Sequence, residues 1–180
     1  ITNADIASGA AIAGTKLVMP TGSVLQVVQV VKTDTFAASL SNNSWTDITG
    51  IAATITPIST SSKIMVEMNL CLSSSGRYLF AKIYRGSTQF GMGDDRGSRT
   101  RTSFMAGGNP DITYNHFMMY NRVFKYLDSP ATTSATTYKL NMGCTHNGTK
   151  AIYINRAESD TDAAYSGTGI STVTLTEIAG

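Results

Sequence analysis

The feature that most constrains the fold is a succession of short segments in which every second residue is apolar. In 78–85, for example, Leu79, Ala81 and Ile83 alternate with bulkier aromatic or charged residues. A two-residue period is that of a β-strand, whose side chains point alternately to opposite faces. No window of helical length carries a convincing helical stripe. The segments predicted as strands are 23–32, 50–56, 63–72, 78–85, 113–127, 136–144, 150–156 and 171–178.

Turn-forming clusters separate these segments. Examples are Ser73–Gly76, Gly107–Pro110 and Asp128–Pro130, which combine Ser, Asn, Asp, Gly and Pro. Only 14% of the residues are charged, against about 25% in a typical domain, and Ser, Thr, Gly and Asn fill the difference. Evenly spaced strands with no helical interruption predict an all-β fold, an antiparallel β-sandwich of jelly-roll type.

Segment 113–127 is apolar or aromatic on both faces. Phe117, Val123 and Leu127 lie on one face, and an aromatic-rich set lies on the other. A monomeric sandwich exposes one polar face of each sheet to water, so a second apolar face predicts cover by another subunit. Cover by loops of the same chain is the alternative. The residues of this segment predicted at a subunit interface are Tyr114, His116, Tyr120 and Phe124.

Residues 1–20 differ from the rest of the chain. Ile6, Ile12 and Leu17 are spaced five or six residues apart, with small residues between them, which fits neither a helix nor a strand. One chain cannot bury such sparse apolar residues, but three chains wound together can place them on a common axis. We therefore expect a short extended stem over 1–20, as part of a trimer interface, and a head domain over 21–180.

Charge and hydropathy exclude several classes of protein. The net charge of +2 comes without any block of like charges, so no nucleic-acid partner is predicted. No apolar stretch is long enough for a transmembrane helix, and the first residues do not resemble a signal peptide. Cys71 and Cys144 fall on opposite strand faces by parity, which favours two free thiols in a protein assembled in a reducing cytoplasm.

Several fragments, in their order and spacing, carry a resemblance that covers nearly the whole chain. They are Ile1–Leu17, Gly22–Val28, Trp45–Ile48, Ser61–Ile64, Tyr126–Pro130, Tyr153–Arg156 and Thr174–Gly180. Together they resemble the C-terminal head of bacteriophage tail fibres and related virion structural proteins, especially those of marine and cyanobacterial phages. The resemblance implies a homotrimeric jelly-roll head, broadly like C1q and tumour-necrosis-factor heads, at the end of a virion fibre. The implied partners are further copies of the chain, the rest of the fibre and other virion proteins, with assembly in the cytoplasm of the bacterial host.

The loop 91–112 matches nothing that can be carried over from that family residue by residue, and the most charged segment of the chain, 91–101, is the candidate receptor site. Its candidate residues are Asp94, Asp95, Arg96, Arg99 and Arg101. Arginine offers forked donors to carboxylate or phosphate, and aspartate accepts hydrogen bonds from sugar hydroxyls. The alternative is a solvated hairpin in which these charges pair with one another.

The remaining candidate chemistry favours binding over catalysis. The loop 158–162 has oxygen ligands at alternate positions, as calcium prefers, but a plain polar turn is the favoured interpretation. His116 and His146 do not form a zinc motif with the cysteines, and no hydrolase motif is present. We therefore predict no enzyme activity, no metal and no cofactor. The predicted function is host-receptor binding, with a bacterial surface glycan or protein as the partner. A purely structural capsid or baseplate role is the alternative, and a polysaccharide depolymerase is the remote one.

Overall fold

The computed structural model describes residues 19–76, 78–106, 116–145 and 148–180. Within these ranges the regular structure is entirely β, and no helix long and apolar enough to span a membrane is found. The strands are β1 (Val24–Lys32), β2 (Phe36–Leu40), β3 (Ser44–Ile55), β4 (Lys63–Ser74), β5 (Leu79–Arg85), β6 (Thr88–Phe90), β7 (Phe104–Met105), β8 (Tyr120–Asp128), β9 (Thr136–Cys144), β10 (Lys150–Ile154) and β11 (Ser171–Ile178).

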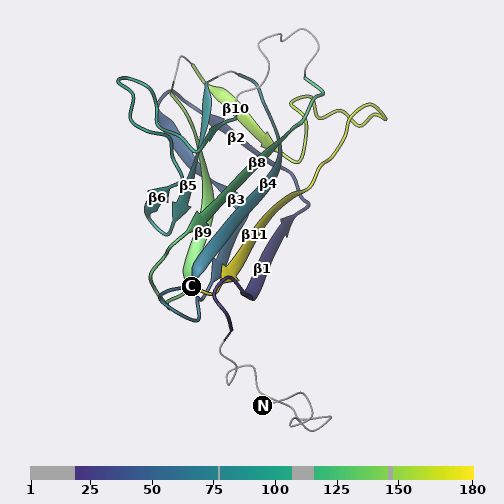
Figure 1. Ribbon diagram of the computed structural model, residues 1–180. Helices are drawn as coiled ribbons and strands as arrows, with labels where there is room; N and C mark the ends of the chain where they lie inside the picture. The colour runs from purple at the N-terminus through teal and green to yellow at the C-terminus, as the bar shows by residue number, and fades with distance from the viewer. Residues whose placement is uncertain (1–18, 77, 107–115, 146–147) are drawn as a thin grey trace, which may run out of the picture.

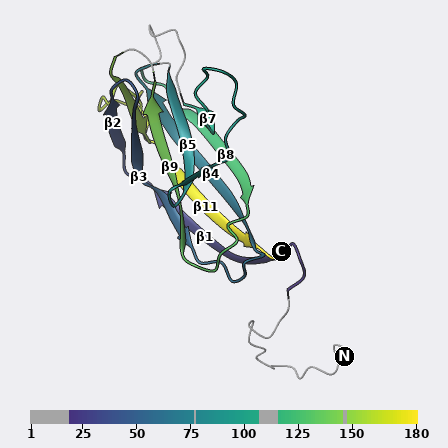
Figure 2. The ribbon, with the colours of Figure 1, turned by 90° about the vertical axis from the view of Figure 1, so that its left-hand side faces the viewer.

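These strands form two antiparallel sheets packed face to face (Figures 1 and 2). Sheet A contains β1, β11, β4, β10 and β2 in that order, with β8 paired to the free side of β4. Sheet B contains β3, β9, β5 and β6, and β7 also pairs with β5. In sheet A, β11 and β10 pair with the same side of β4, β11 along Lys63–Asn69 and β10 along Leu72–Ser74. β8 pairs with the opposite side, so Leu72 lies between Ile154 of β10 and Tyr120 of β8.

The strand order is that of a jelly roll. Sheet A reads β1/β2, β10/β11, β4 and β8, and sheet B reads β3, β9, β5 and β6/β7. Of the ten connections between the described strands, six therefore cross from one sheet to the other, and the last strand lies beside the first. The prediction of an all-β, antiparallel, jelly-roll-like sandwich is confirmed.

Most of the predicted strands are present. β9 and β11 have the predicted bounds, while β3 begins six residues earlier than predicted, at Ser44. The predicted strand 113–127 is shorter: β8 begins at Tyr120, residues 116–119 form a turn and its approach, and 113–115 lie outside the described residues. Strands β2, β6 and β7 were not predicted, because they are short and contain few large apolar residues.

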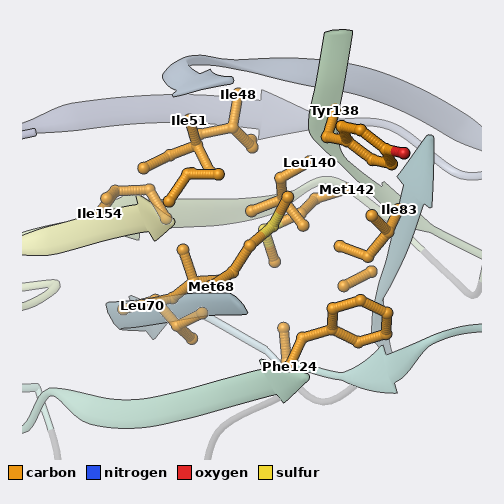
Figure 3. Packing of buried hydrophobic residues seen from close by; sticks show 14 of the residues in the cluster. Ile48, Ile51, Met68, Leu70, Ile83, Phe124, Tyr138, Leu140, Met142 and Ile154 are labelled. Atoms are coloured by element: carbon orange, nitrogen blue, oxygen red, sulfur yellow. The ribbon is translucent and has the colours of Figure 1, made fainter. Parts of the chain in front are cut away.

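The core lies between the two sheets and is built from the inward-facing residues of both. Figure 3 shows Met68 and Leu70 of β4 facing Leu140 and Met142 of β9, with Phe124 of β8 closing one side. All of these side chains are at most 8% exposed. Close packing of alternating Ile, Leu, Met and Val side chains is the main stabilising term of such a sandwich.

Buried polar side chains tie the sheets and loops together. Asp128 at the end of β8 accepts hydrogen bonds from Arg85 Nη1 of β5 at 2.7 and 2.9 Å, and from the hydroxyl of Tyr138 of β9 at 2.7 Å. Because β8 belongs to sheet A and the other two strands to sheet B, this network connects the sheets. Burial, followed by the neighbouring carboxylate, raises the pKa of Tyr138 well above its ordinary value, so its hydroxyl stays protonated and donates.

The carboxylate of Glu177 likewise links the connection between β3 and β4 to sheet A through hydrogen bonds. It is fully buried and accepts hydrogen bonds from Gln26 Nε2 at 2.5 Å and from the backbone N–H of Ile58 at 2.7 Å. Burial alone raises the pKa of this carboxyl, but the hydrogen bonds outweigh it and the net pKa lies below its ordinary value.

The described chain enters and leaves the sandwich at the same end. The N–H of Gly22 donates to the carbonyl of Ala179, and the N–H of Ala179 donates to the carbonyl of Ser23, each at 2.8 Å. Figure 1 shows Gly180 at the bottom of the sandwich and several connecting loops gathered at the opposite end. The predicted stem residues Ile6, Ile12 and Leu17 lie outside the described residues, so the stem stays a prediction.

Candidate functional site

The outer face of sheet A is organised in rows that run across the strands. One row contains Val27, Thr176, Met65 and Leu127 from β1, β11, β4 and β8. The next row, two residues away on each strand, is polar and contains Gln29, Thr174, Glu67 and Lys125. The third row contains Val31, Thr172, Asn69 and Val123. The valines and Leu127 are 47–62% exposed. The two outer strands of this face therefore present apolar side chains to the surroundings.

The polar row of this face satisfies its own hydrogen bonds. Lys125 pairs with Glu67 across β8 and β4 at 3.2 Å, and Gln29 donates to the hydroxyl of Thr174 at 2.9 Å. Asn69 donates to Glu67 at 3.0 Å, and together with Lys125 it lowers the pKa of that carboxyl. The face carries no unpaired charge in these rows, so a second protein surface can cover it without stranding an ion.

A hollow of about 440 Å³ lies at the end of this face nearest the start of β8. Asn69, Cys71, Asn121, Val123 and Ile170 are among its lining residues. Cys71 faces outward at its floor, with its thiol 3.6 Å from the sulfur of Met119, while Cys144 is buried in the core. The predicted orientations of the two cysteines are thus confirmed, and Cys71 is a free thiol. Burial raises the pKa of the Cys71 thiol, which keeps it protonated and unreactive.

The charged loop predicted as a receptor site joins β6 to β7. The N–H of Gly93 donates to the carbonyl of Thr102 at 3.3 Å, and Arg101 Nε donates to the carbonyl of Gly93 at 3.0 Å. Asp94, Asp95, Arg96 and Arg99 are exposed. None of the ion pairs found among the described residues involves them, so the alternative of a self-paired hairpin is not what the geometry shows. Figure 1 shows this loop projecting from the upper part of the sandwich, away from Gly180.

The residues predicted at a trimer interface do not gather on one surface. Phe124 lies in the core of its own subunit, 8% exposed, and its ring contacts Phe90 at a centroid distance of 6.2 Å. Tyr120 has the same inward parity, because strand β8 turns its odd-numbered residues outward. The outward positions of β8 are Asn121, Val123, Lys125 and Leu127, of which Val123 and Leu127 are apolar. Tyr114 lies outside the described residues.

His116 belongs to the loops at the far end. Its Nδ1 is 3.0 Å from Glu158 Oε2, and the neighbouring Phe117 meets Tyr165 edge to face at 5.1 Å. These contacts join the approach to β8 to the connection between β10 and β11. His116 is therefore part of a loop-to-loop contact, and His146 lies outside the described residues.

The acidic loop 158–162 does not gather its oxygens around one point. Glu158 faces His116, and Asp160 pairs with Arg156 at 2.9 Å. Among the residues that the structure describes, no group of three or more His, Cys, Asp or Glu side chains is placed to hold a metal ion.

Sequence reasoning missed the residues that form the outer face of sheet A. Val27, Val31, Val123 and Leu127 share the two-residue period of their strands, and a two-faced apolar pattern was visible in β8. The signal that identifies the face is the register between strands far apart in sequence, such as Val27 opposite Thr176 and Met65 opposite Leu127.

Comparison with known proteins yields solved structures alone. No protein-family model and no curated protein matches the chain. Three solved structures are similar to this chain. The VP2 subviral particle of infectious bursal disease virus has 14% identity and a TM-score of 0.41, covering 86% of this chain and 41% of that one. Infectious bursal virus derived T=1 particles have 17% identity and a TM-score of 0.44, covering 94% and 44%, and infectious bursal disease virus Gx strain has 14% and 0.39, covering 94% and 46%. This chain spans less than half of each of those chains, and all three overlaps are loose.

Proposed function

We propose that this chain is the head of a virion fibre, a homotrimeric structural module that attaches to a component of the bacterial surface. The observation that carries the proposal is the outer face of sheet A. It presents Val27, Val31, Val123 and Leu127 to the surroundings, on a sheet whose central polar row is already internally paired. The resemblance of the sequence to phage fibre heads supports the virion location.

The occupant of this face is a second copy of the same chain. Its charges cancel within the subunit, because Lys125 and Glu67 neutralise each other, so a neighbouring copy can cover the face without stranding an unpaired ion. The apolar flanking strands supply the contact area, and contiguous exposed apolar surface of this kind marks an interaction site. Three copies related by a rotation axis close into a ring, which leaves no copy of the face exposed.

Attachment is assigned to the end of the head that lies away from Gly180. Loop 91–103 presents Arg96, Arg99, Asp94 and Asp95 with no ion-pair partner among the described residues. Three such loops on one trimer convert weak single contacts into useful avidity. The role is binding without cleavage, so we expect no enzyme activity toward the glycan.

The assembly is tested by light-scattering chromatography of residues 1–180 and 20–180. We expect each to elute at three times its own chain mass, which is 19.1 kDa for residues 1–180. Val123→Lys places a charge on the outer face of sheet A and is expected to shift the mass toward one chain. Ile58→Lys is the matched control, because Ile58 is equally exposed, at 66% against 62%, but lies off this face. A single-chain mass for the wild type would refute the trimer.

Attachment is tested separately by binding of the trimer to host cells and to an array of host-surface glycans. The triple variant Arg96→Gln, Arg99→Gln, Arg101→Gln is expected to lose binding while its mass is unchanged. Binding that survives in this variant would remove the loop from the proposal. A wild-type trimer that binds no host component would favour the purely structural role, and release of reducing ends from host polysaccharide would favour a depolymerase.

A further inference from the structure

The outer face of sheet B is unlike that of sheet A. It carries aromatic and polar side chains in rows set by the strand register. The first row runs from Met105 through Phe80 and Gly143 to Trp45, the second contains Lys82, Asn141 and Asp47, and the third contains Gln89, Tyr84 and Lys139.

Trp45 lies flat on this face because Gly143 has no side chain. A Cβ atom at Gly143 would collide with the indole ring of Trp45, so the ring rests directly over the backbone of β9. Phe80 lies on the other side of Gly143 in the same row. Trp45 and Phe80 thus give this row an aromatic surface.

The ammonium of Lys82 lies against this aromatic surface. Its Nζ is 3.9 Å from the centroid of the Trp45 ring, which is a cation–π contact. None of the ion pairs among the described residues involves Lys82. Partial burial lowers the pKa of Lys82, because a cation removed from water without a carboxylate partner is destabilised. This charge is therefore uncompensated.

The neighbouring charges are held in place by one another. Asp47 accepts from Lys139 Nζ at 2.6 Å and from Asn141 Nδ2 at 2.8 Å. These contacts lower the pKa of Asp47, with Asn141 the larger cause and Lys139 the second. With Asp47 neutralising Lys139, the residues of these three rows carry a net charge of one positive unit, which is that of Lys82.

Two polar atoms on this face are buried without any hydrogen-bond partner. They are Asn141 Oδ1, an acceptor beside Lys82 in the second row, and Gln89 Nε2, a donor in the third. A buried polar atom left unpaired costs about 1–3 kcal/mol, so such atoms are rare unless a ligand or water completes them. One acceptor, one donor and one unpaired cation thus lie on adjacent rows beside two aromatic rings.

We propose that the outer face of sheet B binds an acidic saccharide of the host surface. A sugar carboxylate pairs with Lys82, hydroxyl groups donate to Asn141 Oδ1 and accept from Gln89 Nε2, and the apolar face of a sugar ring packs on Trp45 and Phe80. The unpaired positive charge selects an acidic over a neutral sugar. The inference rests on the proposed glycan attachment and adds a second surface to it, separate from loop 91–103.

The chain contains one tryptophan, so its fluorescence reports on this face alone. We would titrate the wild-type trimer with short oligomers of galacturonate, mannuronate and glucuronate, and with a neutral galactose oligomer of equal length. At least one acidic oligomer is expected to change the Trp45 emission saturably, because its carboxylate draws the Lys82 ammonium away from the indole. The affinity is expected to fall with added salt, and the neutral oligomer to bind at least tenfold more weakly.

Substitution of Lys82 separates this site from other effects. Lys82→Gln and Lys82→Met are both expected to weaken binding at least tenfold with no change in trimer mass. Lys150→Gln is the matched control, since it removes the same charge from the start of β10, away from both proposed surfaces, and from a residue in none of the ion pairs found among the described residues; it is expected to bind like the wild type. Equal affinities of the Lys82 and Lys150 variants, equal binding of neutral and acidic oligomers, or no response to any acidic oligomer would each overturn the proposal.

The same measurements distinguish failure of this site from failure of attachment as a whole. If the triple arginine variant of loop 91–103 loses binding to host cells while Lys82→Gln retains it, the head is an attachment module and the site on sheet B is wrong. If no variant and no wild-type trimer binds host cells or oligomers, the attachment function itself is wrong.

Discussion

Asp128 is the residue whose replacement tests most directly how the two sheets are held together. Its carboxylate accepts from Arg85 Nη1 and from the Tyr138 hydroxyl, all within 2.9 Å. Asp128→Ala removes both interactions at once and leaves both donors without this acceptor. The variant is expected to fold to the same sandwich, because the apolar core is untouched, but to be less stable.

The size of the loss follows from the exposure of the two donors. Tyr138 is fully buried, so its unpaired hydroxyl costs about 1–3 kcal/mol. The Arg85 side chain is 26% exposed and recovers part of its hydration, so its loss is smaller than the roughly 3–5 kcal/mol of a fully buried broken pair. The free energy of unfolding is therefore expected to fall by about 3 kcal/mol. If it depends on urea concentration with a slope near 2 kcal/mol/M, the unfolding midpoint falls by about 1.5 M.

The assay is urea unfolding followed by far-ultraviolet circular dichroism at one fixed protein concentration, since assembly makes the midpoint concentration-dependent. Asp47→Ala is the control, because its carboxylate also pairs with a strand neighbour but is 52% exposed, and exposed pairs contribute about 0–1 kcal/mol. Tyr138→Phe should lower the free energy of unfolding by about 1 kcal/mol in the wild type, and by much less when Asp128→Ala is already present. Equal losses for Asp128→Ala and Asp47→Ala would refute the assignment of this network as an inter-sheet tie.

Three further predictions concern the buried carboxylate, the core and the glycine under the indole. Because the folded pKa of Glu177 lies below its ordinary 4.5, its stabilisation is complete above that value and is lost as the pH falls through the folded pKa. Glu177→Gln should therefore be destabilised by about 2 kcal/mol at neutral pH and should converge with the wild type in acid, as measured by unfolding between neutral pH and pH 3. Phe124→Ala should lower the free energy of unfolding by about 3–5 kcal/mol in the same assay. A loss as small as that of a surface substitution would contradict the position of Phe124 in the core. Gly143→Ala should displace the Trp45 ring, cost about 1–3 kcal/mol and shift the emission of the tryptophan, whereas unchanged emission would show that the ring does not rest on Gly143.

The sequence predicts the strands well because their apolar alternation is a local property. β9 and β11 were located to the residue, and the jelly-roll arrangement follows once eight such strands lack helices between them. The short strands β2, β6 and β7 were not predicted, because two to five residues carry too little alternation to be recognised. Phe124 was assigned to the wrong side of its strand, because parity shows that two residues share a face but not which face points inward.

The candidate sites, like the strands, can be predicted from the sequence where their residues are neighbours along the chain, but not where strand pairing brings distant residues together. The exposed charges of loop 91–103 were visible in the sequence as a cluster, because the residues are neighbours along the chain. The outer face of sheet B was not, because Trp45, Lys82 and Asn141 come from three strands separated by up to about a hundred residues and meet only through strand pairing. The need for a glycine at position 143 likewise cannot be recognised from the sequence, because it depends on Trp45 of β3 lying opposite.

The two outer faces of the sandwich differ in a way that assigns them to different partners. A surface that is buried permanently against protein must satisfy its own polar groups, since an unpaired ion or amide trapped there is costly. Sheet A meets this condition, because Glu67 pairs with Lys125 and Gln29 with Thr174 and the apolar residues lie to either side. Sheet B does not, since Lys82 has no carboxylate partner in the part of the chain that the structure describes and Asn141 Oδ1 lacks a hydrogen-bond donor. A polar ligand can supply the missing partners. We therefore propose the assembly interface on sheet A and the saccharide site on sheet B, and we expect Val123→Lys to dissociate the proposed trimer without changing the affinity of the Trp45 surface for acidic sugar.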